Sequence, residues 1–346
     1  MTNSYYKPSG KFSGIFFLYY LLVLVIGVPL VSTIYVYLIY YVPFIYANLL
    51  ITIGCGALLG FLVALAANFG KVRNPLLVLV TTFVAVCALL YVSWAVYIPV
   101  IFAGDILTFG ERFIVAFELL LRPAEILAWA LIINEVGVWT IGEGGEPIRG
   151  ILLSLLWVVE FLLIAGLALA TSWGQPRSPF SEEAGEWHVE KPEKIETDLP
   201  ENFDSMRNQM ENRNFTDFLE LIKAGRTDEL NFMSITVFSP AQEFSTEPHY
   251  LTLESKVVGK KDKVKATTLL THLAIDTQNA REMIAAFEAQ PTLEEPDDLD
   301  ALEDEDAPDT AKDAPVEESK EDPDEDLALQ DDLDDLEDED EDDDDL

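Results

Sequence analysis

The residue of this sequence with the clearest chemical potential is Glu160, a carboxylic acid near the middle of the apolar run Ile151–Trp173. A charge at the centre of a bilayer costs about 2.5–3.5 kcal/mol on insertion scales. We therefore expect Glu160 to be protonated or to pair with a group facing the interior of a helix bundle. The expected neutral partner is Ser93, Tyr91 or another hydroxyl, and Trp157, one turn earlier, should share its helix face.

Two roles of Glu160 are open. As a functional group it would relay protons or cations, which is the default hypothesis for an intramembrane acid. As a structural group it would be a neutral acid whose hydrogen bond fixes the packing of the helices. We favour the structural role, because ion pathways usually place several polar groups in series, and Asn48 and Asn68 lie near helix ends without extending a path.

The rest of the chain carries no pattern of catalytic, metal-binding or cofactor-binding residues. Cys55 and Cys87 fall within apolar runs and should pack as small apolar side chains. His188, His249 and His272 are far apart in the sequence and match no ligand motif. We therefore predict that the protein is not an enzyme, needs no cofactor or metal ion, and does not bind nucleic acid.

The elements that must position Glu160 are membrane-spanning helices. Residues 13–103 contain only two charged side chains, Lys71 and Arg73, so they cannot form the half-polar helices of a soluble core. The predicted fold class is an α-helical membrane protein with four transmembrane helices, an outer amphipathic helical segment, a small cytosolic α+β domain and a disordered acidic tail. The spans are expected at about 14–40, 45–69, 76–102 and 151–173.

The second span contains a stripe of small residues at four-residue spacing: Gly56, Gly60 and Ala64. Such stripes allow two helix backbones to approach closely within a membrane. The stripe is either the seam of a homodimer, which makes the protein a possible homo-oligomer, or a contact with the first or third helix of the same chain. We favour the contact within the chain, because the motif alone does not identify its partner.

The distribution of basic residues predicts the orientation of the chain. The polar lead 1–12 contains Lys7 and Lys11, and the turn between the second and third spans contains Lys71 and Arg73. Arg177, Lys191 and Lys194 follow the fourth span on the same side. By the positive-inside rule both termini lie in the cytoplasm, so we predict a multi-pass protein of the plasma membrane, the inner membrane of a bacterium.

Between the third and fourth spans, residues 104–150 are too charged to cross the membrane. Their apolar side chains recur at helical spacing, and Pro123 is well placed to begin a second helix. We expect two amphipathic helices that lie on the outer interface or cap the bundle. A re-entrant pair of helices is the less favoured alternative.

Beyond the membrane we expect a polar, extended linker at 174–200 and a cytosolic α+β domain at 201–290. Its helical pattern begins at Phe203 and stops at Gly225, and Asp276 or Thr277 should cap the last helix. Between them, the predicted strands are 231–238, 250–258 and 263–273.

The hairpin formed by the last two strands is rich in lysine, with Lys256, Lys260, Lys261, Lys263 and Lys265 against the single acid Asp262. A solvated turn explains these lysines, since exposed lysine is common at sheet edges. The alternatives are a contact with anionic lipid headgroups or a docking site for the acidic tail.

The segment 291–346 is expected to be disordered, because residues 293–346 include 31 Asp or Glu and only two Lys. Leu329, Leu333 and Leu336 would share one face of a helix that folds on a partner. The favoured alternative is an acidic brush that keeps the protein soluble.

Four short stretches resemble an uncharacterised family of bacterial multi-pass membrane proteins: Pro8–Phe12, Tyr41–Asn48, Gly70–Asn74 and Asn134–Trp139. The resemblance implies a bacterial inner membrane and transfers no activity and no site residue. The function we expect is that of a membrane anchor or scaffold, embedded in membrane lipid, that presents its cytosolic domain and tail to protein partners. The alternative is a proton- or ion-transport component that uses Glu160.

Overall fold

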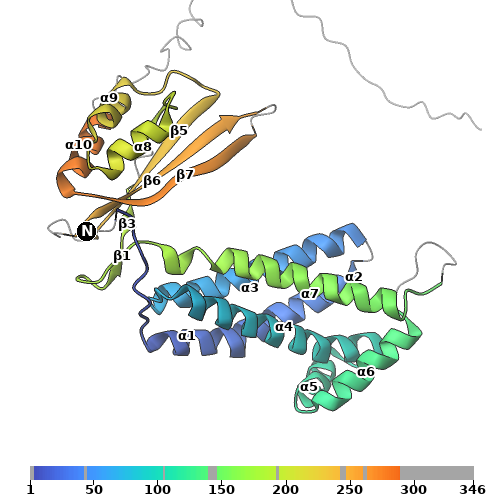
Figure 1. Ribbon diagram of the computed structural model, residues 1–346. Helices are drawn as coiled ribbons and strands as arrows, with labels where there is room; N and C mark the ends of the chain where they lie inside the picture. The colour runs from blue at the N-terminus through green and yellow to red at the C-terminus, as the bar shows by residue number, and fades with distance from the viewer. Residues whose placement is uncertain are drawn as a thin grey trace, which may run out of the picture. The chain divides into compact units, whose positions relative to one another are not determined.

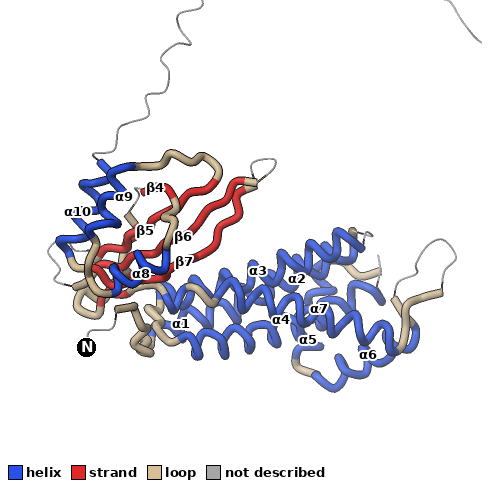
Figure 2. The backbone as a smooth tube through the Cα atoms, turned by 45° about the horizontal axis from the view of Figure 1, so that its top comes forward, coloured by secondary structure: helices blue, strands red, loops and turns tan. Residues whose placement is uncertain are grey.

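The computed structural model describes residues 4–42, 45–103, 106–138, 146–191, 195–241, 247–259 and 263–288. Within them, the ribbon shows a bundle of long helices and a sheet that carries three shorter helices (Figure 1). Figure 2 shows the same division, with helix alone in the bundle and all the long strands in the sheet domain. The predicted acidic tail, including Leu329, Leu333 and Leu336, lies outside the described residues.

Four stretches of apolar residues form helices long enough to cross a membrane, as the sequence predicts. The first is continuous from Ile15 to Tyr41 but is assembled from three pieces. Its middle piece is a π-helical turn, which precedes the predicted kink position Pro29. The segments are α1 Ile15–Leu22, η1 Val23–Gly27, α2 Val28–Tyr41, α3 Ile45–Phe69, α4 Pro75–Ala103 and α7 Ile151–Ser172.

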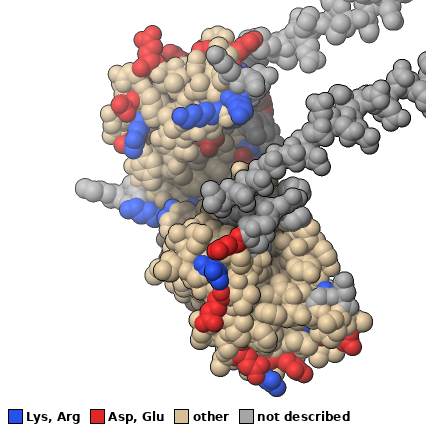
Figure 3. All heavy atoms as spheres, turned by 90° about the vertical axis from the view of Figure 1, so that its right-hand side faces the viewer, with Lys and Arg blue, Asp and Glu red and all other residues tan. Residues whose placement is uncertain are grey.

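The outward surface of these helices is apolar. Leu30, Phe61 and Leu162 are each more than half exposed, which is the opposite of a soluble helix surface. The space-filling view looks onto one end of the bundle, where acidic and basic side chains lie among the uncharged surface (Figure 3). The apolar outward surface is the one expected of helices whose solvent is lipid.

The stripe of small residues packs within the chain, as favoured, but against the fourth span. A Cβ atom at Gly56 would lie 2.8 Å from the Ile164 carbonyl oxygen, and one at Gly60 would lie 2.4 Å from that of Ala168. The expectation of a partner in the first or third helix was wrong. The α3 and α7 backbones touch at both glycines, so neither glycine is free to form a homodimer seam.

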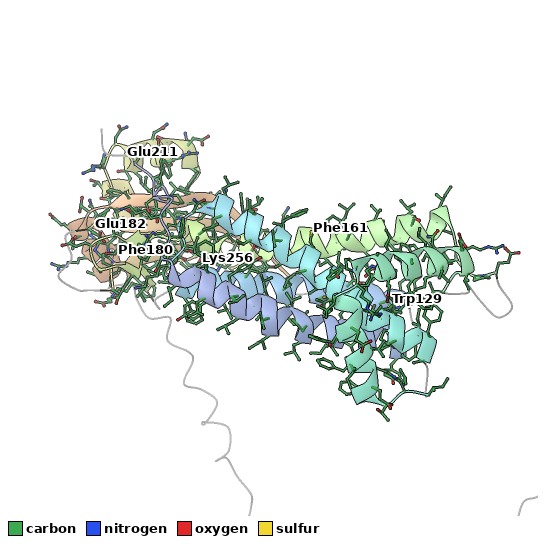
Figure 4. All side chains as sticks on the ribbon, turned by 90° about the horizontal axis from the view of Figure 1, so that it is seen from below. Trp129, Phe161, Phe180, Glu182, Glu211 and Lys256 are labelled. Carbon is green, nitrogen blue, oxygen red and sulfur yellow. The ribbon has the colours of Figure 1, made fainter. Side chains whose placement is uncertain are left out.

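Residues 109–136 form two antiparallel helices, α5 Phe109–Leu120 and α6 Pro123–Val136. The Tyr91 hydroxyl, on α4, donates to the Leu120 carbonyl oxygen at 2.7 Å, and the rings of Phe102 and Trp129 lie 4.6 Å apart (Trp129 is labelled in Figure 4). Tyr91 precedes the end of α4 by twelve residues, about 18 Å along a helix. The pair thus packs against the last half of α4.

The sheet domain is antiparallel and is covered by helices on one face (Figure 1). Its strand order is β3-β5-β6-β7, and β4 also pairs with β5. The core between sheet and helices includes Met210, Phe218, Ile235, Leu251 and Met283. The elements are β3 Val189–Glu190, β4 Ile195–Asp198, α8 Phe203–Glu211, α9 Thr216–Ala224, β5 Asn231–Ser239, β6 His249–Val258, β7 Val264–Ile275 and α10 Thr277–Glu288.

Two expectations about this domain require correction. Residues 174–200 are not a plain linker, because they contain the 3-10 turn η2 Gln175–Arg177, the hairpin β1 Phe180–Ser181 and β2 Glu186–Trp187, and the strands β3 and β4. The continuous helical pattern after Phe203 is broken into α8 and α9, where Arg213 adopts φ +63°. Gly225 does end α9, and the Asp276 carboxylate caps α10 by accepting from the Asn279 N–H at 2.8 Å.

The start of the chain also belongs to the sheet. Tyr5 forms an antiparallel bridge with Leu273 on β7. The Tyr6 N–H donates to the His272 carbonyl oxygen at 2.9 Å, and the Ala274 N–H donates to that of Ser4 at 2.8 Å. Within the predicted polar lead, Ser4–Tyr6 therefore form an edge segment of the sheet.

The contact between α3 and α7 predicts a selective effect of methyl groups. Gly60→Ala forces a Cβ into the backbone of Ala168, so we expect a loss of about 1–3 kcal/mol and a lower Tm in detergent. Gly54→Ala is the matched control, because a Cβ there has no atom within 4 Å. Equal Tm values for the two variants would contradict the close approach.

Candidate functional site

Glu160 lies on α7 and is held by Tyr35 on α2. The Tyr35 hydroxyl donates to the Glu160 carboxylate at 2.6 Å and lies 3.3 Å from the Thr52 hydroxyl on α3. The expected neutral hydroxyl partner is present, but it is Tyr35 and neither Ser93 nor Tyr91. Tyr91 bonds instead to α5, and the buried Ser93 hydroxyl has no hydrogen-bond partner among the described residues.

A cavity of about 240 Å³ surrounds this carboxylate, and each of the four long helices contributes to its wall. Trp157 lines it together with Glu160, as their spacing predicts. Asn48, Thr52 and Ser93 also line it. Asn48 was expected to extend no polar path, yet its Oδ1 is buried next to this cavity without a hydrogen-bond partner.

Sequence reasoning missed Tyr35, Asn48 and Thr52 as neighbours of Glu160. A signal was present, because Asn48 and Thr52 are four residues apart and thus share one face of α3. Two neutral polar side chains on one face of a span, with an acid in another span, indicate a shared polar interior. Among the described residues, no group of three or more His, Cys, Asp or Glu could hold a metal ion.

A second cluster of polar contacts lies where the hairpin β1–β2 meets the turn between α3 and α4. Arg73 forms an ion pair with Glu182 at 3.3 Å, and its guanidinium lies 4.0 Å from the centre of the Phe180 ring (Figure 4). Ser9 and Lys11 also bond to the Glu182 carboxylate. Burial alone would raise the pKa of Glu182, but Ser9, Lys11 and Arg73 together hold it below its ordinary value.

The other strand of the hairpin contacts the same turn. The Trp187 indole N–H donates to the Asn68 carbonyl oxygen at 3.1 Å, and the Lys71 ammonium donates to that of Gly185 at 2.6 Å. The basic residues used to orient the chain therefore also hold the hairpin. We call this set of contacts, from Arg73 and Lys71 to β1–β2, the clamp.

The lysines of the predicted basic hairpin differ in their surroundings. Lys256 turns inward, 4.0 Å from the Glu196 carboxylate and above the Phe232 ring, so it is not part of a free basic patch. Lys263 and Lys265 are exposed. Lys260 and Lys261 lie outside the described residues.

The three histidines are far apart in sequence, but in the sheet domain His188 lies close enough to act electrostatically on both His249 and His272. His188 packs against Tyr250 and lies 3.2 Å from the Pro248 carbonyl oxygen, and His249 bonds to Ser239 at 2.9 Å. Burial is the largest cause that lowers the pKa of each ring. The charge of His188 further lowers the pKa of His249 and of His272, and the pKa of His272 falls to about 4.

Comparisons with protein families, with curated proteins and with solved structures find no match to this chain. The function is therefore inferred from the geometry of the cavity, the clamp and the sheet domain.

The buried histidines predict a loss of stability in mild acid. Their pKa values are lower in the folded chain than the ordinary 6.5, so the unfolded chain binds more protons as the pH falls from 6.5 towards 4. Stability should therefore be complete above pH 6.5 and decline below it. We expect the Tm of the full chain in detergent to fall between pH 7 and pH 5, a range above the ordinary carboxyl pKa values.

His272→Asn should make that fall smaller. Asparagine does not titrate, and it tolerates the left-handed backbone at this position, where φ is +53°. Thr271→Asn, at the neighbouring exposed position of β7, is the control and should leave the fall as it is in the original chain. A His272→Asn curve parallel to that of the original chain would contradict the assignment.

Proposed function

We propose that the protein is an integral membrane anchor that presents its sheet domain and acidic tail to protein partners at the cytosolic face. The observation that carries the proposal is the double attachment of the sheet domain to the bundle. The clamp joins the hairpin β1–β2 to the turn between α3 and α4, and Ser4–Tyr6 pair with β7 immediately before the first span. A domain attached at two points is held in a defined position, which is useful for presenting a binding surface.

The pairing of Tyr5 with Leu273 also supports the predicted topology. Two residues that share a sheet lie on the same side of a membrane, so the chain between them must cross it an even number of times. Four candidate spans separate these residues. Together with the positive-inside rule, the even number of candidate spans supports a cytoplasmic sheet domain.

Transport through Glu160 is the second candidate, and the polar side chains around the cavity favour it. The packing toward the Lys-flanked end of the bundle opposes it. Among the described residues, fully buried apolar side chains lie between Glu160 and the bonded pair of buried hydroxyls Thr82 and Ser172, and they interrupt a polar route. They are Leu59, Val63, Val86, Leu89 and Ile164.

Removal of residues 293–346 tests the presentation of the tail. In a crosslinked pull-down from native membranes, we expect partners bound through the tail to be lost, because the net charge of −29 is removed. Replacement of Leu329, Leu333 and Leu336 by serine is the matched control, since it preserves every charge. Loss in both variants would assign docking to the leucines, and an unchanged partner set after the deletion would contradict the proposal for the tail.

The orientation is tested by trypsin at two exposed basic residues, Lys265 on β7 and Arg149 before α7. In spheroplasts we expect cleavage at Arg149 and protection of Lys265. In inverted membrane vesicles we expect the opposite pattern. Cleavage at Lys265 in intact spheroplasts would place the sheet domain outside and overturn the proposed location.

A further inference from the structure

The cavity beside Glu160 is shaped for more than the packing of helices. Its volume of about 240 Å³ adjoins a second cavity of about 420 Å³, because Ile39, Tyr97 and Val138 line both. The side chains that line the second cavity are aliphatic or aromatic and include Phe102 and Ile133. The first cavity holds the Glu160 carboxylate and a few other polar groups within mostly apolar walls, and we call it the polar compartment for those groups. A site with one acid in apolar surroundings would suit an amphiphilic molecule.

The polar compartment presents acceptors without a matching cation. The Glu160 carboxylate receives one hydrogen bond, from Tyr35. The Asn48 carbonyl oxygen and the Ser93 hydroxyl are buried without a partner, and Ser93 is only 6% exposed. None of the described residues lining this compartment is Lys, Arg or His. Buried polar atoms without partners are costly, so a ligand that supplies donors and positive charge would satisfy them.

Aromatic rings border the same compartment. The Trp94 and Trp157 rings meet edge to face at 5.0 Å, and Tyr97 lies 6.0 Å from Trp94 in the same arrangement. All three rings line the compartment that contains Glu160. Tryptophan and tyrosine faces attract organic cations, and several rings around one acid form a recognised ammonium site.

The surroundings of the compartment indicate how a ligand enters. Leu49 on α3 and Val159 on α7 line it and are 46% and 44% exposed, so an opening lies between these helices on the outer surface of the bundle. Toward the Lys-flanked end, Leu59 and Ile164 are fully buried and close the interior. If the bundle spans a membrane, the opening faces lipid, and a lipid-soluble molecule has the shortest path to Glu160.

We propose that this cavity is a binding site for a hydrophobic amine, held by its ammonium group between Glu160 and the rings of Trp94 and Trp157, with its alkyl chain along the aliphatic and aromatic side chains of the two adjoining cavities. The charge of the amine pairs with the carboxylate, and its N–H groups reach the free acceptors Asn48 and Ser93. The site is independent of the anchor function, since it uses none of the residues of the clamp or of the sheet domain.

The test is the binding of n-octylammonium to the purified full chain in dodecyl maltoside, a detergent with neither charge nor amine. Calorimetric titration below the micellar range of the amine should give saturable binding and a raised Tm, as for any ligand of the folded state. 1-Octanol, which has the same chain and no charge, should bind at least tenfold more weakly. Sodium chloride alone should leave the Tm unchanged.

Three variants locate the site. Glu160→Gln removes the charge and keeps an acceptor for Tyr35, and Trp157→Leu removes one ring; each should weaken octylammonium at least tenfold. Tyr20→Phe is the matched control, because it deletes a buried hydrogen bond between α1 and α4, to the Thr81 carbonyl oxygen, away from the cavity. It should bind like the original chain. Trp157→Leu keeps the test decisive if Glu160→Gln does not fold.

Several results would overturn the proposal. These are an absence of saturable octylammonium binding, equal affinity for 1-octanol, equal affinity in the original chain and in the folded site variants, or stabilisation by sodium ion instead of the amine. A final titration with added phosphatidylethanolamine identifies the source of the amine. Competition assigns the site to a lipid headgroup, and its absence assigns it to a free amine; both results retain the ammonium site.

Discussion

The closest approach in the bundle, between α3 and α7, sets the position of the groups around Glu160. Gly56 lies against Ile164, and Gly60 lies against Ala168, so the two helices keep one register over two turns. One turn further along, the same register brings Thr52 beside Glu160, and the Tyr35 hydroxyl is bonded within reach of both. The lack of a Cβ at Gly56 and Gly60 thus determines which polar side chains share the interior.

The same register divides the interior into two halves with different chemistry. On the side of the glycines, backbone contact leaves no space, and the buried side chains are aliphatic or small. On the side of Glu160, α3 and α7 separate enough for a cavity whose walls carry hydroxyl, amide and indole groups. Because lipid supplies no partner for a polar atom, such groups are stable only where the helices face one another or enclose a ligand.

The spans were predictable from the sequence because lipid requires long uninterrupted apolar helices, and the observed α3, Ile45–Phe69, agrees with the expected 45–69. The position of Glu160 within a long apolar helix could also be predicted from the sequence. The identity of its partner could not, because packing sets the register between helices and Tyr35 is 125 residues away in the chain.

The sheet domain was predicted only in part, because only its longer strands leave a clear pattern in the sequence. The long strands β5, β6 and β7 have enough residues to reveal alternation, whereas β3 has two residues and lies in a proline-rich segment that reads as a linker. The pairing of Tyr5 with Leu273 leaves no local signal at all. The packing of α5 and α6 beside α4 was also not the first prediction. Charged residues such as Glu118 and Arg122 gave the segment an amphipathic pattern, which is typical of helices at a membrane interface.

The edge segment Ser4–Tyr6 has a consequence for biosynthesis. It leaves the ribosome before the four long helices, and its partner on β7 follows about 270 residues later. At about 5–20 residues per second, the segment waits roughly 13 to 54 s while the intervening chain is synthesised. For that interval its backbone groups are available to any exposed strand edge nearby, so the sheet is completed only as a late, long-range step of assembly.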